Sequence, residues 1–597
     1  MPWWDWAEWE HFIDWMALNG VNLTLSITGQ ESVWYKVWTE MGMTDEQVRS
    51  YFTGPAHLPW HRMTNIDHWG GPLPKSWLDD QEMLQKKIVE RERSLGIRTA
   101  LPAFNGHVPE YLCDIYPDAP ISHIKPWAGY TEKESPWFLD PMSDLYGEIQ
   151  KKFIDMQTRM YGTDHIYGLD IFNEIAPPST EPEYLGRVSR QIYESIAAVD
   201  KDAVWLQMGW LFYNDRDRWT PDRVEAYLTS FPAENQLMMD YYAEQIEVWR
   251  LHNNFHNVPF LWCYLGNFGG NSHMSNTLDR VNERLEAALA ETVVDGIGCT
   301  LEGFDCTPYA HEYTLEKAWD FETHKDLDKW FSHLSVLRGG CDDPALQQAW
   351  DIVKHDINTR HEASQMYVCG RFVGGLDGRP RTDCHHSYKF TDADEATLRN
   401  VVSLMLSSKG KGDTFDYDLV NFTRQWMTAR FWQMERDYKA AAAEGDTAAM
   451  KSHAVSIISL MEDMDHLLGC REEFLMGKWI SDARAKGNTP EEKDYYEQNA
   501  RNLLSSWSME NNDPHLNDYA CREWNGLIKD LYIPRWKAFF EAQTAGNFDQ
   551  KPFWDNVLTP IERDFWQTNR STYPAKARGQ ARRMCATVFN KYQTNNL

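Results

Sequence analysis

The chain contains 597 residues, of which 42% are hydrophobic and 25% are charged, as in typical soluble globular proteins. Because this length exceeds what one hydrophobic core usually supports, two or more domains are expected. The 59 basic and 89 acidic residues give a formal charge of −30. This charge argues against a nucleic-acid partner, since phosphate binding requires an excess of Lys and Arg. No apolar run reaches the roughly 18 residues of a membrane-spanning helix, so no membrane partner is predicted.

The sequence lacks the common motifs for metals and cofactors. It contains no HExxH, GxSxG or GxxxxGK[ST] pattern, and its ten cysteines form neither a CxxC pair nor an even disulfide framework. The cluster Asp383, Cys384, His385 and His386 has no further ligands at useful spacing, so we interpret it as a surface loop. No metal and no cofactor are predicted.

The first half of the chain alternates short apolar or β-branched runs with amphipathic segments, which is typical of βα units around a parallel sheet. Helices are expected between these runs, at 78–95, 142–161, 183–199 and 275–291. The predicted strands cover 21–27, 98–104, 165–173, 203–210, 236–243, 258–266 and 294–302. Seven parallel strands with intervening helices predict a (β/α)8 TIM barrel over residues 1–310 that is short of one strand.

The chain opens directly on a predicted helix at 5–18, in which apolar residues recur at helical spacing. We therefore expect the first barrel strand to belong just before Trp3 and to be missing, so that the catalytic barrel is truncated at its amino terminus. A barrel without one strand would expose two unpaired sheet edges. The first residues also lack the basic and apolar regions of a secretory signal peptide.

Strand signals fade after residue 310, and long helical patterns predict an all-α domain over 311–597. The Gly-rich stretch 370–388 is the irregular insertion in this half and is predicted to be a loop. The predicted helices cover 389–407, 415–441, 446–468, 491–507, 519–543, 553–570 and 575–592.

Two acidic residues end predicted barrel strands, where the active sites of such barrels lie. Glu174 is followed by Pro177 and Pro178, which stop further strand pairing, and Glu302 precedes Gly303, which lets the chain turn close to a ligand. An Asn-Glu pair leaving a barrel strand is typical of the acid/base position of retaining glycosidases. Each glutamate could instead be a solvated carboxylate at a strand end.

A pair of carboxylates fits glycoside hydrolysis, which passes through an oxocarbenium-like state. One carboxylic acid protonates the leaving oxygen while the other carboxylate attacks or stabilises C1. The 28 tryptophans fit the same chemistry, because indole faces stack on sugar rings, although most of them are expected to lie in the core.

Further motifs occur in a characteristic order along the chain. They are WWDW at 3–6, IDWMALNG at 13–20, GQE at 29–31, FTGPA at 52–56, GPLP at 71–74, LPAF at 101–104, GHVP at 106–109, FNE at 172–174, GWLF at 209–212 and NFGGN at 267–271. With these motifs the sequence resembles the α-N-acetylglucosaminidases of glycoside hydrolase family 89, over essentially its whole length. So many matches in one order are highly specific.

The resemblance implies a role for each candidate site residue. Glu174 would be the general acid/base and Glu302 the nucleophile of a retaining, double-displacement mechanism. Trp127 could equally serve packing, and His107 could be a structural, hydrogen-bonded histidine. The residues implied to line the subsite for the terminal sugar are Asn173, Trp60, His107, Trp127 and Trp210, with Asp170 beneath the acid.

The resemblance also implies the substrate, a glycan with terminal non-reducing α-linked N-acetylglucosamine such as heparan sulfate, and a lysosomal or secreted location. In an α-linked 2-acetamido sugar the acetamido group and the leaving group are cis. The acetamido oxygen therefore cannot attack C1 from the rear, and a protein carboxylate is required. A competing hypothesis is a non-catalytic carbohydrate-binding protein or an inactive truncated homologue. Whether the chain forms a homo-oligomer is left open.

Overall fold

The computed structural model describes residues 2–274, 277–303, 307–357, 367–370, 390–507, 516, 518–569 and 572–594. The chain forms two compact units. The first comprises Met1–Leu265, Arg280–Thr300 and His311–Phe321, and the second comprises Gly266–Asp279, Leu301–Ala310 and Glu322–Leu597. The two segments 266–279 and 301–310 interrupt the first unit and group with the second. A single boundary at residue 310 stays a prediction.

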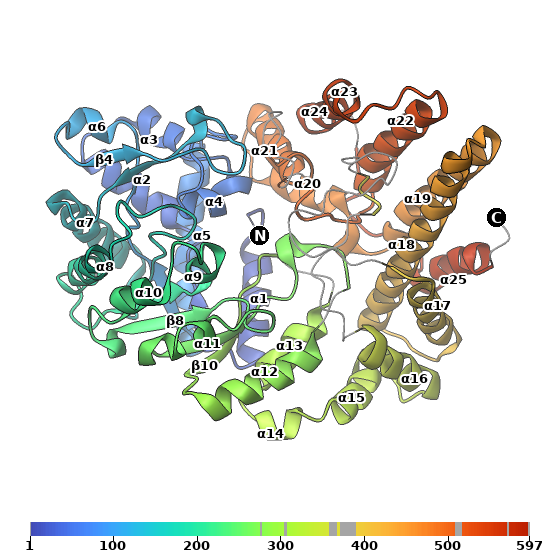
Figure 1. Cartoon of the computed structure of the whole chain (residues 1–597), viewed down its shortest axis with the longest axis horizontal. Coiled ribbons are helices and arrows are strands. Elements are labelled where there is room, and N and C mark those ends of the chain that lie inside the picture. The colour runs from blue at the N-terminus through green and yellow to red at the C-terminus, as the bar shows by residue number, and fades with distance from the viewer. Residues whose placement is uncertain are drawn as a thin grey trace. The chain divides into compact units, whose positions relative to one another are not determined.

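The first unit is built around a curled, parallel, seven-stranded sheet whose strand order follows the chain (Figure 1). Each of the seven predicted runs contains one strand, and the α/β barrel-type fold class is confirmed. The observed strands are shorter than the predicted runs. They are β1 Leu23–Leu25, β2 Arg98–Pro102, β6 Ile166–Gly168, β7 Val204–Met208, β8 Gln236–Asp240, β9 Phe260–Tyr264 and β10 Gly296–Cys299.

One apolar cluster runs across the middle of this sheet. Five successive strands, β2 and β6 to β9, each contribute one buried side chain to it. The cluster consists of Ala100, Ile166, Leu206, Met239 and Cys263. Parallel strands that are buried in this way need near-continuous apolar runs, which explains why the runs were recognisable in the sequence.

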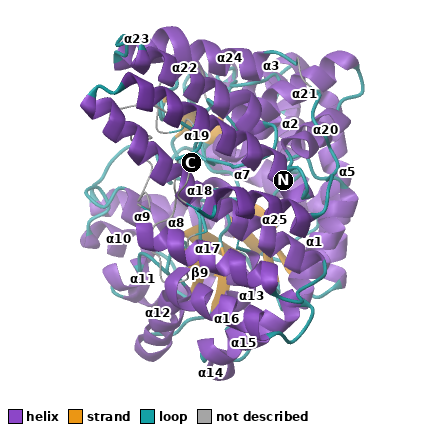
Figure 2. Cartoon of the chain, turned by 90° about the vertical axis from the view of Figure 1, so that its right-hand side faces the viewer, coloured by secondary structure: helices purple, strands orange, loops and turns teal. Residues whose placement is uncertain are grey.

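Helices connect successive strands of the sheet along the chain, and Figure 2 colours helices purple and strands orange. Helix α1 packs on α5, α2 packs on α7, and α7 packs on α8. Asp5 begins α1 with a capping box, in which its carboxylate accepts the backbone N–H groups of Ala7 and Glu8. The bounds of these helices are α1 Trp6–Leu18, α2 Gln30–Glu40, α5 Lys75–Ser94, α7 Asp144–Tyr161 and α8 Pro182–Ala197.

A small antiparallel sheet lies between β2 and α7 in the chain, and the sequence patterns did not predict it. Its strands are β3 His107–Val108, β4 Ile121–His123 and β5 Trp137–Leu139, in the order β3-β5-β4. These strands have only two or three residues each, too few to produce a recognisable alternation.

The second unit is largely helical, as predicted. Its longest helix, α18 Asp413–Glu444, packs on α17 Asp392–Ser407, α19 Thr447–Leu468 and α25 Ala581–Tyr592. The other long helices are α15 Leu327–Gly339, α16 Pro344–Ile352, α20 Met476–Ala485, α21 Pro490–Leu503 and α22 Ile533–Thr544. Among the described residues, none of the helices combines the length and the low polarity that crossing a bilayer would require.

The first strand is tied to the barrel by a buried glutamate. Glu92, on α5, accepts hydrogen bonds from the Thr24 and Ser26 hydroxyls, each at 2.9 Å. Burial raises the pKa of Glu92 to about 7, although both hydroxyl donors oppose this rise. The native state therefore binds the Glu92 proton more tightly than the unfolded chain does.

This difference predicts that Glu92 destabilises the fold increasingly as the pH rises from about 4 to about 7, by an amount on the order of 3 kcal/mol. Glu92→Gln should remove this part of the pH dependence. Urea unfolding at pH 4 and pH 8 measures it, with Glu90→Gln as a control because Glu90 is exposed on the same helix. Parallel pH curves for Glu92→Gln and the parent protein would contradict the prediction.

Candidate active site

Three candidate residues lie in the turn that follows β6. The strand ends at Gly168, so the predicted run 165–173 continues beyond it as irregular backbone carrying Asp170, Asn173 and Glu174. The Asp170 carboxylate accepts the Met208 backbone N–H at 2.6 Å, which ties the turn to the neighbouring strand β7. Burial raises the pKa of Asp170 to about 7, against the opposing effect of that hydrogen bond.

The Glu174 carboxylate is partly exposed and is held by two donors within the first unit. The indole N–H of Trp127 donates to Oε2 at 2.7 Å, and the Asn65 amide donates to the same oxygen at 3.0 Å. The Trp127 ring also stacks on Tyr130, with ring planes 14° apart. Trp127 therefore has a packing contact and a polar contact with the candidate acid. Asn65 was not predicted from the sequence.

Asn173 is a buried amide without a hydrogen-bond partner among the described residues. Its side chain is 2% exposed, and neither Nδ2 nor Oδ1 has a partner. An unsatisfied buried polar group costs about 1–3 kcal/mol. Such a group calls for an explanation, such as a ligand, a catalytic role or an ordered water.

His107 lies in β3 and is fully engaged by hydrogen-bond acceptors. Its Nε2 lies 2.6 Å from Asp67 Oδ1, and its Nδ1 lies 3.0 Å from the His61 carbonyl oxygen. Both ring nitrogens therefore lie within hydrogen-bond distance of an acceptor oxygen. Although burial opposes ionisation, the neighbouring His107 and His61 hold the pKa of Asp67 at about 2. Asp67 and His107 thus form a buried ion pair.

The side chains of His61, Asp67 and His107 also have the composition of a metal site. Two ligands of a tetrahedral zinc ion would be roughly 3.3 Å apart, given metal–ligand bonds of about 2.0–2.1 Å. The separation of 2.6 Å between His107 and Asp67 is instead that of a hydrogen-bonded pair. The geometry therefore favours the ion pair.

The ion pair anchors the segment that carries Trp60, in the short helix α4 Leu58–Arg62, and Asn65, in the loop that follows. The Asp67 backbone N–H donates to the Glu134 carbonyl at 2.9 Å, and the Asn65 N–H donates to the Trp60 carbonyl at 2.9 Å. Trp60 is partly exposed within α4. The loop thus connects His107, through Asp67 and Asn65, to the Glu174 carboxylate.

Trp210 follows β7 and begins the short helix α9 Trp210–Asn214. Gly209 makes this placement possible, because a Cβ atom there would lie 3.2 Å from the Met239 carbonyl oxygen and 3.2 Å from the Phe255 ring. The Trp210 side chain is partly exposed, with its ring 5.6 Å from that of Tyr213.

Glu302 is exposed and belongs to the second unit, where two donors bind it. The Tyr519 hydroxyl donates to its Oε2 at 2.7 Å, and the Gly269 backbone N–H donates to the same oxygen at 2.9 Å. A Cβ atom at Gly303 would lie 3.1 Å from the Gly270 nitrogen, so the chain packs closely against the Gly270 backbone here. Strand β10 ends at Cys299, earlier than predicted.

Tyr519 was missed because the sequence pattern predicted a helix over 519–543. The described chain becomes helical only near residue 528, and the residues before it form turns. Asp518 and Cys521 have left-handed backbone angles, φ 56° and 41°, which a right-handed helix does not allow.

The cluster Asp383 to His386, which was predicted to be a surface loop without a metal, lies outside the described residues.

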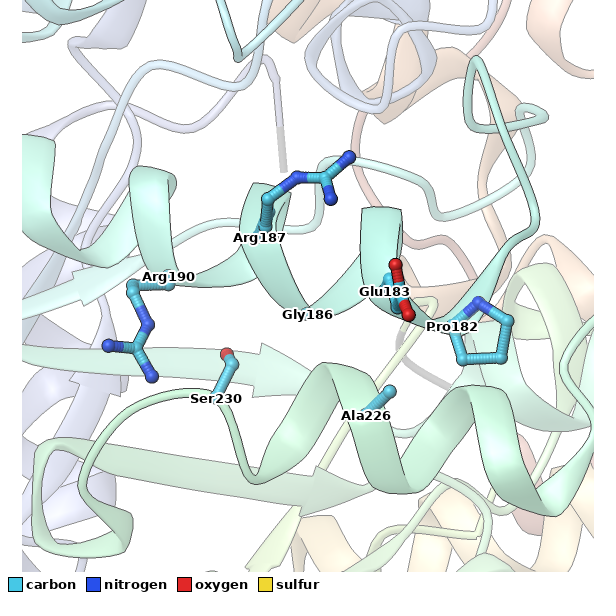
Figure 3. Close-up of a pocket in the computed structure, with 7 residues that line it drawn as sticks. All are labelled: Pro182, Glu183, Gly186, Arg187, Arg190, Ala226 and Ser230. Atoms are coloured by element: carbon cyan, nitrogen blue, oxygen red, sulfur yellow. The ribbon is translucent and has the colours of Figure 1, made fainter.

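A separate surface groove of about 540 Å³ runs between α8 and α10 Pro221–Leu228 (Figure 3). The helices approach closely at Gly186, where a Cβ atom would lie 3.0 Å from the Ala226 carbonyl oxygen. In Figure 3 Arg190 points toward Ser230, whereas Arg187 points away from α10. None of the groove residues is a predicted site residue. They are Pro182, Glu183, Gly186, Arg187, Arg190, Ala226 and Ser230.

A barrel-type parallel sheet with hydrogen-bonded glutamates after two of its strands is an arrangement also found in (β/α)-barrel glycoside hydrolases. Residues 1–321 match the family model of the α-N-acetylglucosaminidase TIM-barrel domain, and 330–591 match that of its C-terminal domain. Human α-N-acetylglucosaminidase is 34% identical over 602 residues, which cover 99% of this chain and 80% of the human protein. The chain belongs to the α-N-acetylglucosaminidase family, glycoside hydrolase family 89, and is a glycoside hydrolase.

Solved structures of a family 89 glycoside hydrolase from Clostridium perfringens have the same fold. The complex with PUGNAc has a TM-score of 0.89 at 25% identity and covers 100% of this chain and 68% of that chain. A variant with two glutamates replaced by glutamine, in complex with its substrate GlcNAc-α-1,4-galactose, has a TM-score of 0.89 at 24% identity. That match covers 99% of this chain and 67% of the other.

The ion pair at His107 generates a prediction about stability. Asp67→Asn should destabilise the protein at pH 7 by an amount on the order of 2 kcal/mol, because it removes the buried counter-charge. Since the pKa of native Asp67 is lowered, its contribution is present above about pH 4 and is lost as the pH falls toward 2.

The difference in urea unfolding free energy between the parent and Asp67→Asn should therefore shrink below pH 4. Asp79→Asn serves as the control, because Asp79 is an exposed member of a surface pair with Lys75. Equal stability of the Asp67 variant and the parent at pH 7 would show that the pair is not ionised.

Proposed function

We propose that the chain is a retaining exo-glycosidase that removes terminal non-reducing α-linked N-acetylglucosamine, with Glu174 as acid/base and Glu302 as nucleophile. The observation that carries this proposal is the pair of glutamates after β6 and β10, each held on one oxygen by two hydrogen-bond donors. Such donors pre-organise a carboxylate, which a catalytic group needs and a solvated surface glutamate does not have.

In the proposed mechanism the acid and the nucleophile act in two displacements. Glu174 gives its proton to the glycosidic oxygen as the bond from that oxygen to C1 breaks, and a Glu302 oxygen forms an ester bond to C1. Glu174, now a carboxylate, then takes a proton from water as the water oxygen attacks C1 and releases Glu302. Two inversions give N-acetylglucosamine with its α-configuration retained.

The stereochemistry of the substrate supports a protein nucleophile. In an α-linked 2-acetamido sugar the acetamido oxygen lies on the same face as the leaving group, so it cannot displace it from the rear. The second carboxylate must therefore come from the protein.

We assign the sugar subsite to the residues around Glu174. The unpartnered Asn173 amide can exchange hydrogen bonds with the acetamido group, which would relieve its unsatisfied state. Partly exposed Trp60, Trp127 and Trp210 supply faces for stacking. His107 is assigned a supporting role, because both of its ring nitrogens are already engaged.

Asp170 is assigned to the floor of the turn beneath Glu174. Since burial raises its pKa to about 7, Asp170 is mostly neutral in mildly acidic solution and becomes charged above pH 7.

The glycans proposed as substrates include heparan sulfate, and the proposed location is lysosomal or secreted. The C. perfringens family 89 enzyme, with two of its glutamates replaced by glutamine, forms a complex with its substrate GlcNAc-α-1,4-galactose. This complex supports terminal α-linked N-acetylglucosamine as the substrate class.

The two proposed roles predict different responses to the leaving group. Glu174→Gln should lower kcat/KM on GlcNAc-α-1,4-galactose by about 10²–10⁴-fold, but far less on p-nitrophenyl α-N-acetylglucosaminide, because kcat/KM reports the first displacement and nitrophenolate leaves without protonation. Glu302→Gln should abolish turnover of both substrates, since neither can form the covalent intermediate.

Steady-state kinetics of both variants measure these effects, with Glu183→Gln as a control at an exposed glutamate on α8. Full activity of Glu302→Gln would remove the nucleophile assignment. If the parent chain binds both sugars but turns over neither, the hypothesis of a carbohydrate-binding protein would replace that of an enzyme.

A further inference from the structure

The turn that presents Tyr519 to Glu302 is strained. Asp518 and Cys521 are both non-glycine residues with left-handed backbone angles, and the Cys521 N–H donates to the Asp518 carbonyl at 2.7 Å. Left-handed backbone is unfavourable at non-glycine residues, and it persists only where surrounding contacts fix it. Contacts elsewhere in the second unit must therefore hold this turn.

A buried guanidinium provides that contact. Arg535, on α22, donates through Nη1 to both Asp518 carboxylate oxygens and to the Cys369 carbonyl, each at 3.0 Å. Its Nη2 donates to Glu562 at 3.1 Å. The side chains of Arg535 and Asp518 are both 0% exposed. Although burial opposes the charge, Asp518 and Glu562 raise the pKa of Arg535, so the guanidinium stays ionised.

The same turn also controls the second donor to Glu302. The Arg522 guanidinium donates to the Gly269 carbonyl at 3.1 Å, while the Gly269 N–H donates to Glu302. Gly269 has φ 60°, and a Cβ atom there would lie 2.7 Å from the Tyr519 ring. Only glycine therefore lets Tyr519 and the Gly269 N–H reach the same carboxylate oxygen.

A buried ion pair rarely adds net stability over a well-packed apolar alternative, because desolvation offsets the attraction between the charges. A planar guanidinium does, however, fix the position and direction of what it binds. Here it binds the residue immediately before Tyr519. This arrangement can therefore fix the direction of the Tyr519 hydroxyl group.

We propose that Arg535 and Asp518 are positioning residues, which hold the strained turn so that Tyr519 and Gly269 fix the orientation of the Glu302 carboxylate for attack on C1. This inference rests on the proposed role of Glu302 as nucleophile. The Arg535 and Asp518 side chains are fully buried, so their effect reaches the reaction through the Tyr519 hydroxyl.

A double-mutant cycle on p-nitrophenyl α-N-acetylglucosaminide tests the inference. A hydrogen bond to a charged group contributes about 1.5–3 kcal/mol, so Tyr519→Phe should lower kcat roughly 10–150-fold with little change in KM. Asp518→Asn should lower kcat to a similar extent. Because Asp518 acts through the hydroxyl, the double variant should be no slower than the slower single variant.

Asp418→Asn is the matched control, because Asp418 pairs with Arg338 through two hydrogen bonds of 2.7 Å in the same unit and is also buried. It should lower the urea unfolding free energy and leave kcat unchanged. If Asp518→Asn does not fold, Arg535→Lys takes its place in the cycle, since it keeps the charge and loses the fork geometry.

Losses in kcat that multiply in the double variant would overturn the inference, as would an unchanged kcat in the folded Asp518 or Arg535 variant. Glu302→Gln separates this failure from that of the proposed function. An inactive Glu302→Gln with a multiplicative cycle rejects only the positioning role, whereas an active Glu302→Gln rejects the nucleophile itself.

Discussion

Two buried salt bridges determine how the candidate catalytic glutamates are held. In the first unit, Asp67 pairs with His107 and lies two residues from Asn65, the amide donor to Glu174. In the second unit, Asp518 pairs with Arg535 and precedes Tyr519, the hydroxyl donor to Glu302. Removing one partner leaves the other buried without its counter-charge, which destabilises the fold. Each pair therefore fixes the loop that supplies a hydrogen-bond donor to Glu174 or to Glu302.

This arrangement explains how irregular backbone can hold the two glutamate side chains in defined orientations. Neither glutamate lies on a strand, because β6 and β10 end before them, so strand geometry alone does not orient their side chains. Two donors on one carboxylate oxygen restrict rotation of the carboxyl group, and the ion pairs restrict movement of the donors. Glu302 follows a barrel strand in sequence yet groups with the helical unit, which holds both of its donors.

The sequence predicted those features that depend on local periodicity and on strand ends. The seven strands were recognisable because both faces of a parallel sheet are buried, and the helices because apolar residues recur at helical spacing. Glu174 and Glu302 could be proposed because barrel sites lie after the strands. Asn65 and Tyr519 could not be found, because 109 and 217 residues separate them from the glutamates they contact. Left-handed residues at 518 and 521 also end the helical pattern predicted from 519.

Trapping the covalent intermediate tests the central assignment most directly. A 5-fluoro glycosyl fluoride of α-N-acetylglucosamine slows the second displacement more than the first, so the glycosyl–enzyme accumulates, and peptide mass spectrometry locates the sugar. The account predicts one adduct, in the peptide that contains Glu302, and no adduct in the Glu302→Gln variant. An adduct on Glu174 or on another carboxylate would contradict it.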